Sequence, residues 1–353
     1  MNSIEVNVNR PYEVQIGSGL LQDVGGHVRR LLPKVRTVAV VTDDTVGGLY
    51  LATVAASVAR AGMEFCSYSI APGEASKSGA EYLALLHWLA EAEVTRTDCI
   101  LALGGGVVGD LAGLAAATYL RGVPYIQLPT TLLAMVDSSV GGKCGIDLPA
   151  GKNLAGAFYQ PALVLADTDT LDTLPEAVFR EGLAEVIKYG MLGSARLLDQ
   201  LQGDDIMLEL PSVIATCVAL KRDIVEQDEF DMGQRMLLNL GHTVGHAIER
   251  LGDYTIPHGH AVAIGMAVDT RAAVRRGLCP AACLYLLESL LDRYQLPSRT
   301  AYGPEALFEA ALHDKKRAGA EITIVVPCGL GQSELMTIPV ASLQAWIELG
   351  VAT

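Results

Sequence analysis

The spacing of hydrophobic residues changes near the middle of the chain. In the first half, short runs rich in β-branched residues alternate with longer stretches rich in alanine and leucine. This alternation predicts a largely parallel β-sheet covered by helices. The predicted strands cover residues 37–42, 65–70, 99–103, 125–128 and 162–166.

In the second half, apolar residues recur at the three- and four-residue intervals of amphipathic helices. The predicted helices cover residues 176–192, 211–228, 234–251, 261–276 and 281–294. A late apolar run at 322–326, followed by Pro327 and Gly329, indicates a strand that returns to pack elsewhere. We therefore expect an α/β domain over residues 1–174 and a helical domain over residues 175–353.

Composition and charge narrow the class of protein. The formal net charge of −14 argues against nucleic acid or an anionic membrane as the main partner, because either would repel the surface on average. No apolar run is long enough for a secretory signal or a membrane span, so we expect a cytoplasmic protein. The seven cysteines are scattered and include no CxxC pair. The sequence therefore predicts neither a disulfide framework nor a cysteine zinc site.

A glycine-rich turn follows the third predicted strand and opens a helix. Gly104-x-Gly106-x-x-Gly109 fits the fingerprint of a turn whose backbone N–H groups approach a pyrophosphate. The turn lies in the third strand unit, and no acidic residue follows about twenty positions later, so a packing role for the glycines is equally compatible. Asp43 ends the first predicted strand, and the turn with Glu74 and Lys77 follows the second. Three such strand ends favour a nucleotide-binding crevice.

The segment 128–161 carries few charges, and these lie beside glycines. Asp137, Lys143, Lys152 and Asn153 are the polar residues that stand out. Two lysines and an amide beside glycines suit an anionic group such as a phosphate. A solvated loop with ordinary surface lysines explains this pattern less well.

Four of the seven histidines fall between residues 242 and 260. His242 and His246 are four apart on a predicted helix and so share a face, and His258 opens another helix after Pro257. The joint spacing favours a metal site. Spacing alone leaves open whether His246 or His260 is the third imidazole.

Two or three imidazoles leave a divalent ion short of ligands and negative charge, so a carboxylate is expected from elsewhere. Glu185 is the best donor, because its helix is otherwise apolar on that side and it shares a face with Lys188. Glu181 and Glu249 are weaker candidates.

The motifs GGGVVGD, RGVPYIQLPTTLLAMVDSSVGGK, GKNLAGAFYQP, GLAEVIKYG, LNLGHTVGHAIE, HGHAVAIGM and HDKKRAG occur in this order. Together they resemble the 3-dehydroquinate synthase family of sugar-phosphate cyclases, most strongly from Gly104 to Met266. The resemblance implies a Rossmann-like NAD-binding α/β domain, an all-α metal-binding domain, and an active site in the cleft between them. It also implies NAD and zinc as cofactors, with cobalt as an alternative ion.

The resemblance also implies roles for individual residues. The zinc ligands would be Glu185, His242 and His258, whereas His246 would face the substrate. Arg121 matches a residue that reaches the neighbouring subunit's site, which implies a homodimer. The positions that match substrate-facing residues are Asp137, Lys143, Asn153, Lys188, Lys221, Arg235, Asn239 and Lys315 or Lys316. The positions that match cofactor-facing residues are Asp43, Glu74, Lys77, Gly105, Gly106, Val107, Asp110, Thr130, Thr131, Asp137, Ser138, Lys143 and Lys152. The chain departs from the family at His260, where glutamate is common, and at Asp147-Leu148, where Asn-His is frequent.

The implied reaction converts the phosphorylated sugar acid 3-deoxy-D-arabino-heptulosonate 7-phosphate into 3-dehydroquinate and phosphate, a step of aromatic amino-acid biosynthesis. It combines transient oxidation by NAD, phosphate elimination, reduction and aldol closure. The alternatives are a cyclase that makes amino-dehydroquinate, 2-deoxy-scyllo-inosose or a valiolone, a metal-dependent polyol dehydrogenase, and a catalytically silent binding protein. Arg235, Asn239 and the Lys315–Lys316 pair favour dehydroquinate, and Lys143 with Asn153 argues against a dehydrogenase.

Overall fold

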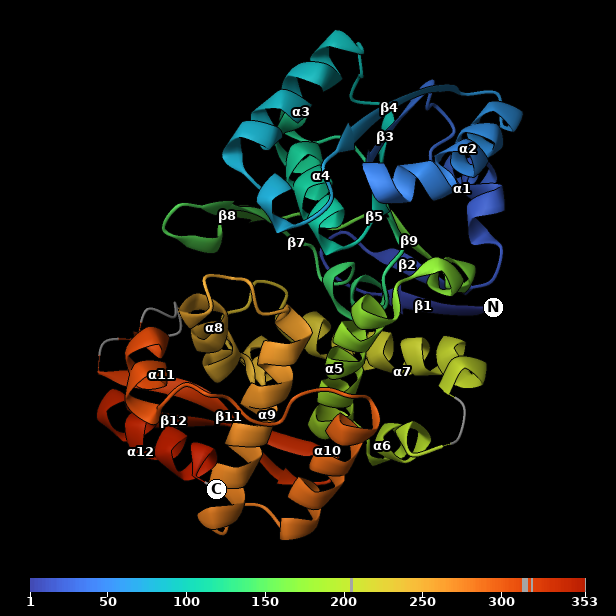
Figure 1. The fold of residues 1–353 in the computed structure, drawn as a ribbon. Coiled ribbons are helices and arrows are strands. Elements are labelled where there is room, and N and C mark those ends of the chain that lie inside the picture. Colours follow the sequence, from blue (N-terminus) through green and yellow to red (C-terminus); the bar gives the residue numbers. More distant parts are fainter. Residues whose placement is uncertain (204–205, 313–316, 319, 353) are drawn as a thin grey trace. The chain divides into compact units, whose positions relative to one another are not determined.

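The computed structural model describes residues 1–203, 206–312, 317–318 and 320–352 (Figure 1). The chain divides into two compact units, Met1–Pro175 and Glu176–Thr353.

The first unit is built on a seven-stranded sheet in the order β1-β2-β9-β6-β5-β3-β4. All five predicted strands are present, and all are parallel to their neighbours. Prediction missed the antiparallel pair β1–β2, which extends the sheet beside β9. The strands are β1 (Asn2–Val6), β2 (Tyr12–Gly17), β3 (Thr37–Asp43), β4 (Glu64–Ile70), β5 (Cys99–Gly104), β6 (Tyr125–Pro129) and β9 (Leu163–Asp167).

Helices cover both faces of this sheet, and the alternation of side chains along its strands explains why. In β3, Val38 and Val40 pack into one core with the helices α1 and α2, whereas Ala39 and Val41 pack into another with α3 and α4. A strand buried on both faces reads as a nearly continuous apolar run, as β3 does from Val38 to Val41. The helices are α1 (Val24–Leu31), α2 (Asp44–Arg60), α3 (Gly79–Glu91) and α4 (Gly106–Thr118).

The connections of this sheet reverse direction beside β3. From β3 the chain continues to β4 on one side and then to β5 on the other side. Ligands of open α/β sheets bind at such a switch point, beyond the carboxyl ends of the strands. Asp43 and Gly104 are the last residues of the two neighbouring strands at this point.

The glycine-rich segment 128–161 forms short elements where no strands were predicted. A turn of π-helix, η4 (Ala134–Ser138), precedes an antiparallel hairpin of β7 (Lys143–Leu148) and β8 (Gly151–Phe158). The remaining short helices of this unit are η1 (Leu20–Asp23), η2 (Glu74–Ser76), η3 (Tyr119–Arg121) and η5 (Thr168–Thr173).

The second unit is mainly helical, as predicted. The predicted helix over residues 234–251 is interrupted at Gly241, whose φ of 77° is left-handed, so a 3-10 turn precedes the helix proper. The described helical elements are α5 (Glu176–Gly193), α6 (Ala195–Leu201), α7 (Ile206–Gln227), η6 (Gln234–Asn239), α8 (His242–Leu251), α9 (His258–Arg275), α10 (Ala281–Arg293), α11 (Pro304–Ala311) and α12 (Val340–Val351). Among the described residues, none of the helices combines the length and apolar character needed to cross a bilayer.

The prediction of an all-α second domain needs one correction. Its described residues also form an antiparallel sheet of β10 (Arg317–Ala318), β11 (Glu321–Gly329) and β12 (Gln332–Pro339). The apolar run at 322–326 lies within β11. Its partner β12 was not predicted, because it is a half-exposed strand that contains several polar residues. The buried side of the sheet contributes Ile322, Ile324 and Ile338 to a core shared with α8, α9 and α12.

Two glycines allow α9 to approach the start of α8 closely. A Cβ atom at Gly265 would lie 1.9 Å from the carbonyl oxygen of Gly241. The buried carboxylate of Asp269 accepts hydrogen bonds from the backbone N–H of Gly241 (3.2 Å) and from the indole N–H of Trp346 (2.9 Å). The backbone that precedes His242 is therefore fixed by both packing and hydrogen bonding.

We predict that Gly265→Ala destabilises the protein by roughly 1–3 kcal/mol, the usual cost of overpacking a closed core. Equilibrium denaturation measures the change. Gly48→Ala is the matched control, because a Cβ atom on this exposed residue of α2 meets nothing within 4 Å. The control should be stabilised by up to about 1 kcal/mol, the gain in helix propensity. Equal stability of Gly265→Ala and wild type would contradict the close approach.

Candidate metal and cofactor sites

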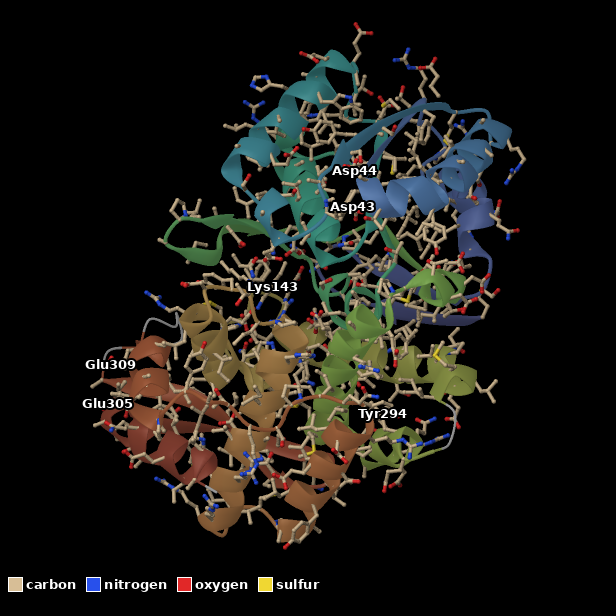
Figure 2. The ribbon with its side chains drawn as sticks, in the orientation of Figure 1. Asp43, Asp44, Lys143, Tyr294, Glu305 and Glu309 are labelled. Carbon is tan, nitrogen blue, oxygen red and sulfur yellow. The ribbon has the colours of Figure 1, made fainter. Side chains whose placement is uncertain are left out.

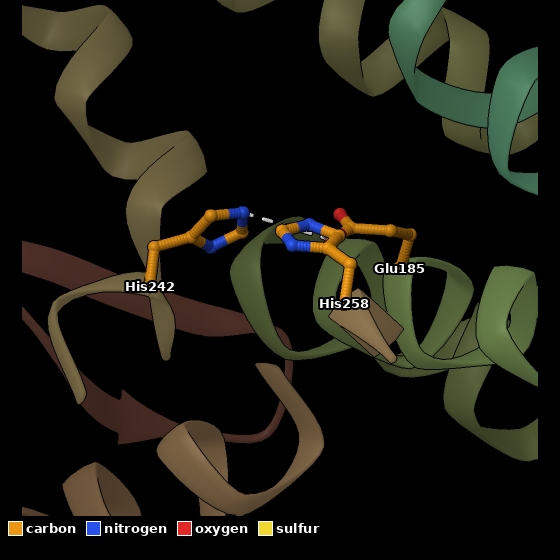
Figure 3. Close-up of side chains that lie close together, drawn as sticks. All are labelled: Glu185, His242 and His258. Carbon is orange, nitrogen blue, oxygen red and sulfur yellow. Dashed lines mark ion pairs between the residues drawn. The ribbon is translucent and has the colours of Figure 1, made fainter. Parts of the chain in front are cut away.

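Three side chains from three helices of the second unit form a cluster that can hold a metal ion. Glu185 lies in α5, and His242 and His258 are the first residues of α8 and α9. One ligand atom from each lies within 4.8 Å of the others (Figure 3). Glu185 Oε1 is 3.7 Å from His242 Nε2 and 3.5 Å from His258 Nε2.

The carboxylate of Glu185 is fully buried, in a stretch of α5 that runs without exposure from Gly182 to Met191. Its Oε2 atom forms an ion pair with Lys188, which is 1% exposed and lies one helical turn later. Burying an ion is costly unless opposite charges and hydrogen-bond donors surround it. Lys188 and the two imidazoles supply that environment, as their spacing on the helices allows.

Both imidazoles present Nε2 to Glu185 because a second group holds Nδ1. His242 Nδ1 lies 3.1 Å from the carbonyl oxygen of Leu240, and His258 Nδ1 lies 3.4 Å from Glu249 Oε2. Burial lowers the pKa of His258, but hydrogen bonds with Glu185 and Glu249 outweigh this and raise it to about 10. The cluster thus favours positive charge strongly, either as a proton or as a divalent cation.

The donor set fits zinc or cobalt in a catalytic site. Two imidazoles and one carboxylate are a ligand combination of catalytic zinc, which keeps a further position open for water or substrate. The spacing argument left His246 and His260 as rivals for a third imidazole, and neither belongs to the cluster formed by the described residues. His246 is exposed, with its ring 5.4 Å from that of His242 and 6.4 Å from that of His258. Burial and the charge of Arg180 lower the pKa of His260.

In the first unit, the glycine turn lies at the sheet's switch point and packs closely against the segment that follows β6. Gly105 directly precedes α4, and a Cβ atom there would lie 3.1 Å from Thr131 Cγ2. A Cβ atom at Gly106 would lie 3.1 Å from Ser138 Oγ. Thr130, at the end of the neighbouring β6, has a buried hydroxyl oxygen with no hydrogen-bond partner among the described residues. The turn therefore offers helix N-terminal amides and a buried hydroxyl to a bound nucleotide.

Lys77 connects the strand-end residues to the β7–β8 hairpin. Its Nζ atom lies 2.5 Å from Asp110 Oδ2 and donates to Asn153 Oδ1 at the same distance. Burial lowers the pKa of Lys77, but the carboxylates of Asp110 and Glu74 outweigh this and raise it. Lys77 therefore stays charged, and its ammonium group fixes the side chain of Asn153.

Asn153 is also held through its backbone. It adopts a left-handed φ of 55°, and its N–H donates to Asp147 Oδ1 at 2.7 Å. Asp147 donates its own N–H to the carbonyl of Lys77. The departure from the family at Asp147 thus places a carboxylate where it shapes the backbone of a predicted substrate residue.

The other predicted residues of the first unit lie in the following places. Asp43 lies at the start of α2 (Figure 2). It caps this helix, since its Oδ1 accepts hydrogen bonds from the N–H groups of Thr45 and Val46. Lys143 is exposed at the start of β7, and Asp137 is half-buried in η4. Lys152 Nζ lies 3.9 Å from Glu74 Oε1. Arg121 is exposed and follows Leu120 in a left-handed pair of residues, with φ values of 50° and 64°.

The remaining predicted substrate residues belong to the second unit. Lys221 and Arg235 are buried, and Arg235 Nη1 donates to the carbonyl of Glu229 at 2.6 Å. Asn239 is half-buried and donates to the carbonyl of Met236. Lys315 and Lys316 lie outside the described residues.

The sequence prediction underrated one residue, Glu249, which was considered only as a weak candidate ligand. The signal was present, because Glu249 lies two helical turns after His242 and hence on the same face of α8. Periodicity cannot show, however, that this face meets the start of α9.

The chain is similar to known proteins over almost its whole length. Residues 67–181 match the family model described as "3-dehydroquinate synthase N-terminal", and residues 182–317 match "3-dehydroquinate synthase C-terminal". The chain is 42% identical over 343 residues to a 3-dehydroquinate synthase from Enterococcus faecalis (strain ATCC 47077 / OG1RF). This alignment covers 96% of this chain and 96% of the synthase.

Two solved structures share the fold. A 2-deoxy-scyllo-inosose synthase complexed with carbaglucose-6-phosphate, NAD+ and Co2+ has a TM-score of 0.88 at 24% identity and covers 98% of this chain and 99% of its own. A 2-epi-5-epi-valiolone synthase from Streptomyces hygroscopicus subsp. jinggangensis 5008, with NAD+ and Zn2+ bound, has a TM-score of 0.87 at 27% identity. The alignment with the latter covers 97% of this chain and 96% of the synthase.

Proposed function

The chain belongs to the 3-dehydroquinate synthase family, and from this premise we propose how its residues carry out the cyclisation of 3-deoxy-D-arabino-heptulosonate 7-phosphate to 3-dehydroquinate. The observation that carries the choice of substrate is the 42% identity over 96% of an enzyme named 3-dehydroquinate synthase. The cluster of Glu185, His242 and His258 supports the metal chemistry that such a reaction needs.

In this proposal Glu185, His242 and His258 hold zinc, and the switch point of the first unit's sheet holds NAD. When bound, NAD would accept a hydride from the ring carbon that bears a hydroxyl group and later return it, and zinc would supply Lewis-acid chemistry at that hydroxyl group. The cofactor-facing residues are Asp43, Glu74, Lys77, Gly105, Gly106, Val107, Asp110, Thr130, Thr131, Asp137, Ser138, Lys143 and Lys152.

The substrate carries a phosphate and a carboxylate, and we assign cationic and polar residues to them. Lys143 and Asn153 bind the phosphate, and the ammonium group of Lys77 keeps the amide of Asn153 in place. We assign His246, which is exposed beside the cluster, to contact the leaving phosphate or to move a proton. Arg235 and Lys221 bind the carboxylate, with one of Lys315 and Lys316 as a further contact.

The main alternative is a cyclase that acts on a different sugar phosphate. The fold does not distinguish these enzymes, because a 2-deoxy-scyllo-inosose synthase and a valiolone synthase both superpose closely on this chain. Their identities of 24% and 27% are well below the 42% found with the 3-dehydroquinate synthase. Turnover of a panel of sugar phosphates compares the two proposals directly.

We also propose that the enzyme works in the cytoplasm. All seven cysteines have free thiols, the state that a reducing compartment maintains.

We predict that catalytic amounts of NAD sustain the reaction, because the hydride returns to the substrate within each turnover. Phosphate release from the heptulosonate phosphate should continue far beyond one equivalent of added NAD, without accumulation of NADH. A chelator should stop it, and added zinc should restore it. Consumption of one NAD per product would instead indicate a dehydrogenase.

We predict that His258→Ala and His246→Ala separate a metal ligand from a substrate contact. His258→Ala should purify with little zinc and almost no activity, since only two ligands remain. His246→Ala should keep its zinc and lose roughly a hundredfold or more in rate. Metal analysis by mass spectrometry and phosphate-release kinetics measure both effects. Zinc lost from His246→Ala but kept by His258→Ala would reverse the assignment.

We propose a homodimer in which Arg121 completes the partner's phosphate site. Mixing the inactive variants Arg121→Ala and His258→Ala should then restore about a quarter of wild-type activity. Half of the dimers formed contain one subunit of each variant, and one of the two sites in every such mixed dimer is intact. Sedimentation velocity confirms the dimer in the same samples. If Arg121 serves its own subunit, or if the protein is a monomer, the mixture stays as inactive as its components.

A further inference from the structure

The face of α8 that carries His242 also carries a second buried acid. Glu249 is 2% exposed and lies two helical turns after His242. Its Oε2 atom is 3.4 Å from His258 Nδ1, the ring nitrogen that points away from Glu185. His258 is therefore flanked by a carboxylate on each of its two nitrogens.

The groups that contact Nδ1 of the two imidazoles differ in charge. A neutral carbonyl, that of Leu240, contacts Nδ1 of His242, whereas the charged carboxylate of Glu249 contacts Nδ1 of His258. An acceptor at Nδ1 places the proton there and leaves the lone pair on Nε2, the atom that faces Glu185. A charged acceptor also makes the imidazole a stronger donor to a cation.

The balance of buried charge shows why a second carboxylate is needed. The positive charge of Lys188 offsets the negative charge of Glu185, so these two residues together leave a divalent ion uncompensated. The imidazoles are neutral when they act as ligands. Among the described residues of this cluster, Glu249 supplies one further negative charge at a buried position and so lowers the uncompensated charge of the divalent ion.

We propose that Glu249 is a positioning residue of the metal centre: it orients His258 through Nδ1 and lowers the net positive charge of the occupied site. The inference rests on the proposed function in one respect, namely that Glu185, His242 and His258 bind a divalent ion. Loss of such an outer carboxylate typically weakens metal affinity by roughly 10–100-fold.

The test is the zinc dissociation constant of the full chain, measured by competition with a chromophoric chelator. Glu249→Ala should bind zinc about 10–100-fold more weakly than wild type. Glu249→Gln keeps the size and an acceptor oxygen but loses the charge, so its loss should be smaller. In cobalt-loaded protein, both variants should shift the visible absorption bands, because the donor strength of His258 changes. Unaltered zinc affinity and cobalt spectra in both variants would overturn the proposal.

Glu288→Gln is the matched control for general damage to the helical unit. Glu288 accepts hydrogen bonds from Arg271, which lies about 20 Å further along α9 than His258 at the helical rise. Its zinc affinity should equal that of wild type, and a loss as large as that of Glu249→Gln would show that the effect is not specific to the metal centre.

His258→Ala in the same assay distinguishes a failure of the proposed metal site from a failure of the proposed role of Glu249. If His258→Ala loses zinc and the Glu249 variants do not, the metal site stands and the role of Glu249 is refuted. If His258→Ala binds zinc like wild type, the proposed metal site itself fails.

Discussion

The buried carboxylate of Glu185 is the constraint on which the second unit's chemistry depends. A fully buried ion is stable only where opposite charge and hydrogen-bond donors are already in place. Lys188 on the same helix and two imidazoles from other helices meet this requirement. Each imidazole is the first residue of its helix, so the close packing of α8 on α9 at Gly241 and Gly265 determines where the cluster forms. The same charge that makes Glu185 costly to bury suits it to bind a metal ion.

The first unit obeys a different constraint, the geometry of parallel strands. Polar residues at the ends of β3, β5 and β6 share one edge of the sheet, because parallel strands all end on the same side. This brings Asp43, the Gly104–Gly106 turn and Thr130 to the switch point. Lys77 then ties this edge to the hairpin through Asp110 and Asn153. One buried ammonium group thus connects residues of the proposed cofactor site with Asn153 of the proposed phosphate site.

Much of this architecture could be predicted from the sequence, because the core strands are continuously apolar and the helices are strongly periodic. β1, β2 and β12 were missed because the prediction relied on short apolar runs, whereas these strands mix polar with apolar residues. In β2 the apolar Tyr12, Val14 and Ile16 alternate with polar residues, the pattern of a half-buried strand. The interruption before α8 depends on the left-handed backbone conformation of Gly241, and the spacing of apolar residues cannot predict a backbone conformation. Spacing placed His242 and His246 on one face, but it left His246 and His260 open as the third imidazole, because the ligand set depends on how separate helices meet.

X-ray absorption at the zinc edge of the purified, fully active protein tests the central claim most directly. The account predicts only nitrogen and oxygen neighbours at about 2.0–2.2 Å, with the multiple-scattering pattern of two imidazoles. The buried and half-buried thiols of the chain should take no part. Sulfur neighbours at about 2.3 Å, or a spectrum without imidazole scattering, would show that Glu185, His242 and His258 are not the metal ligands.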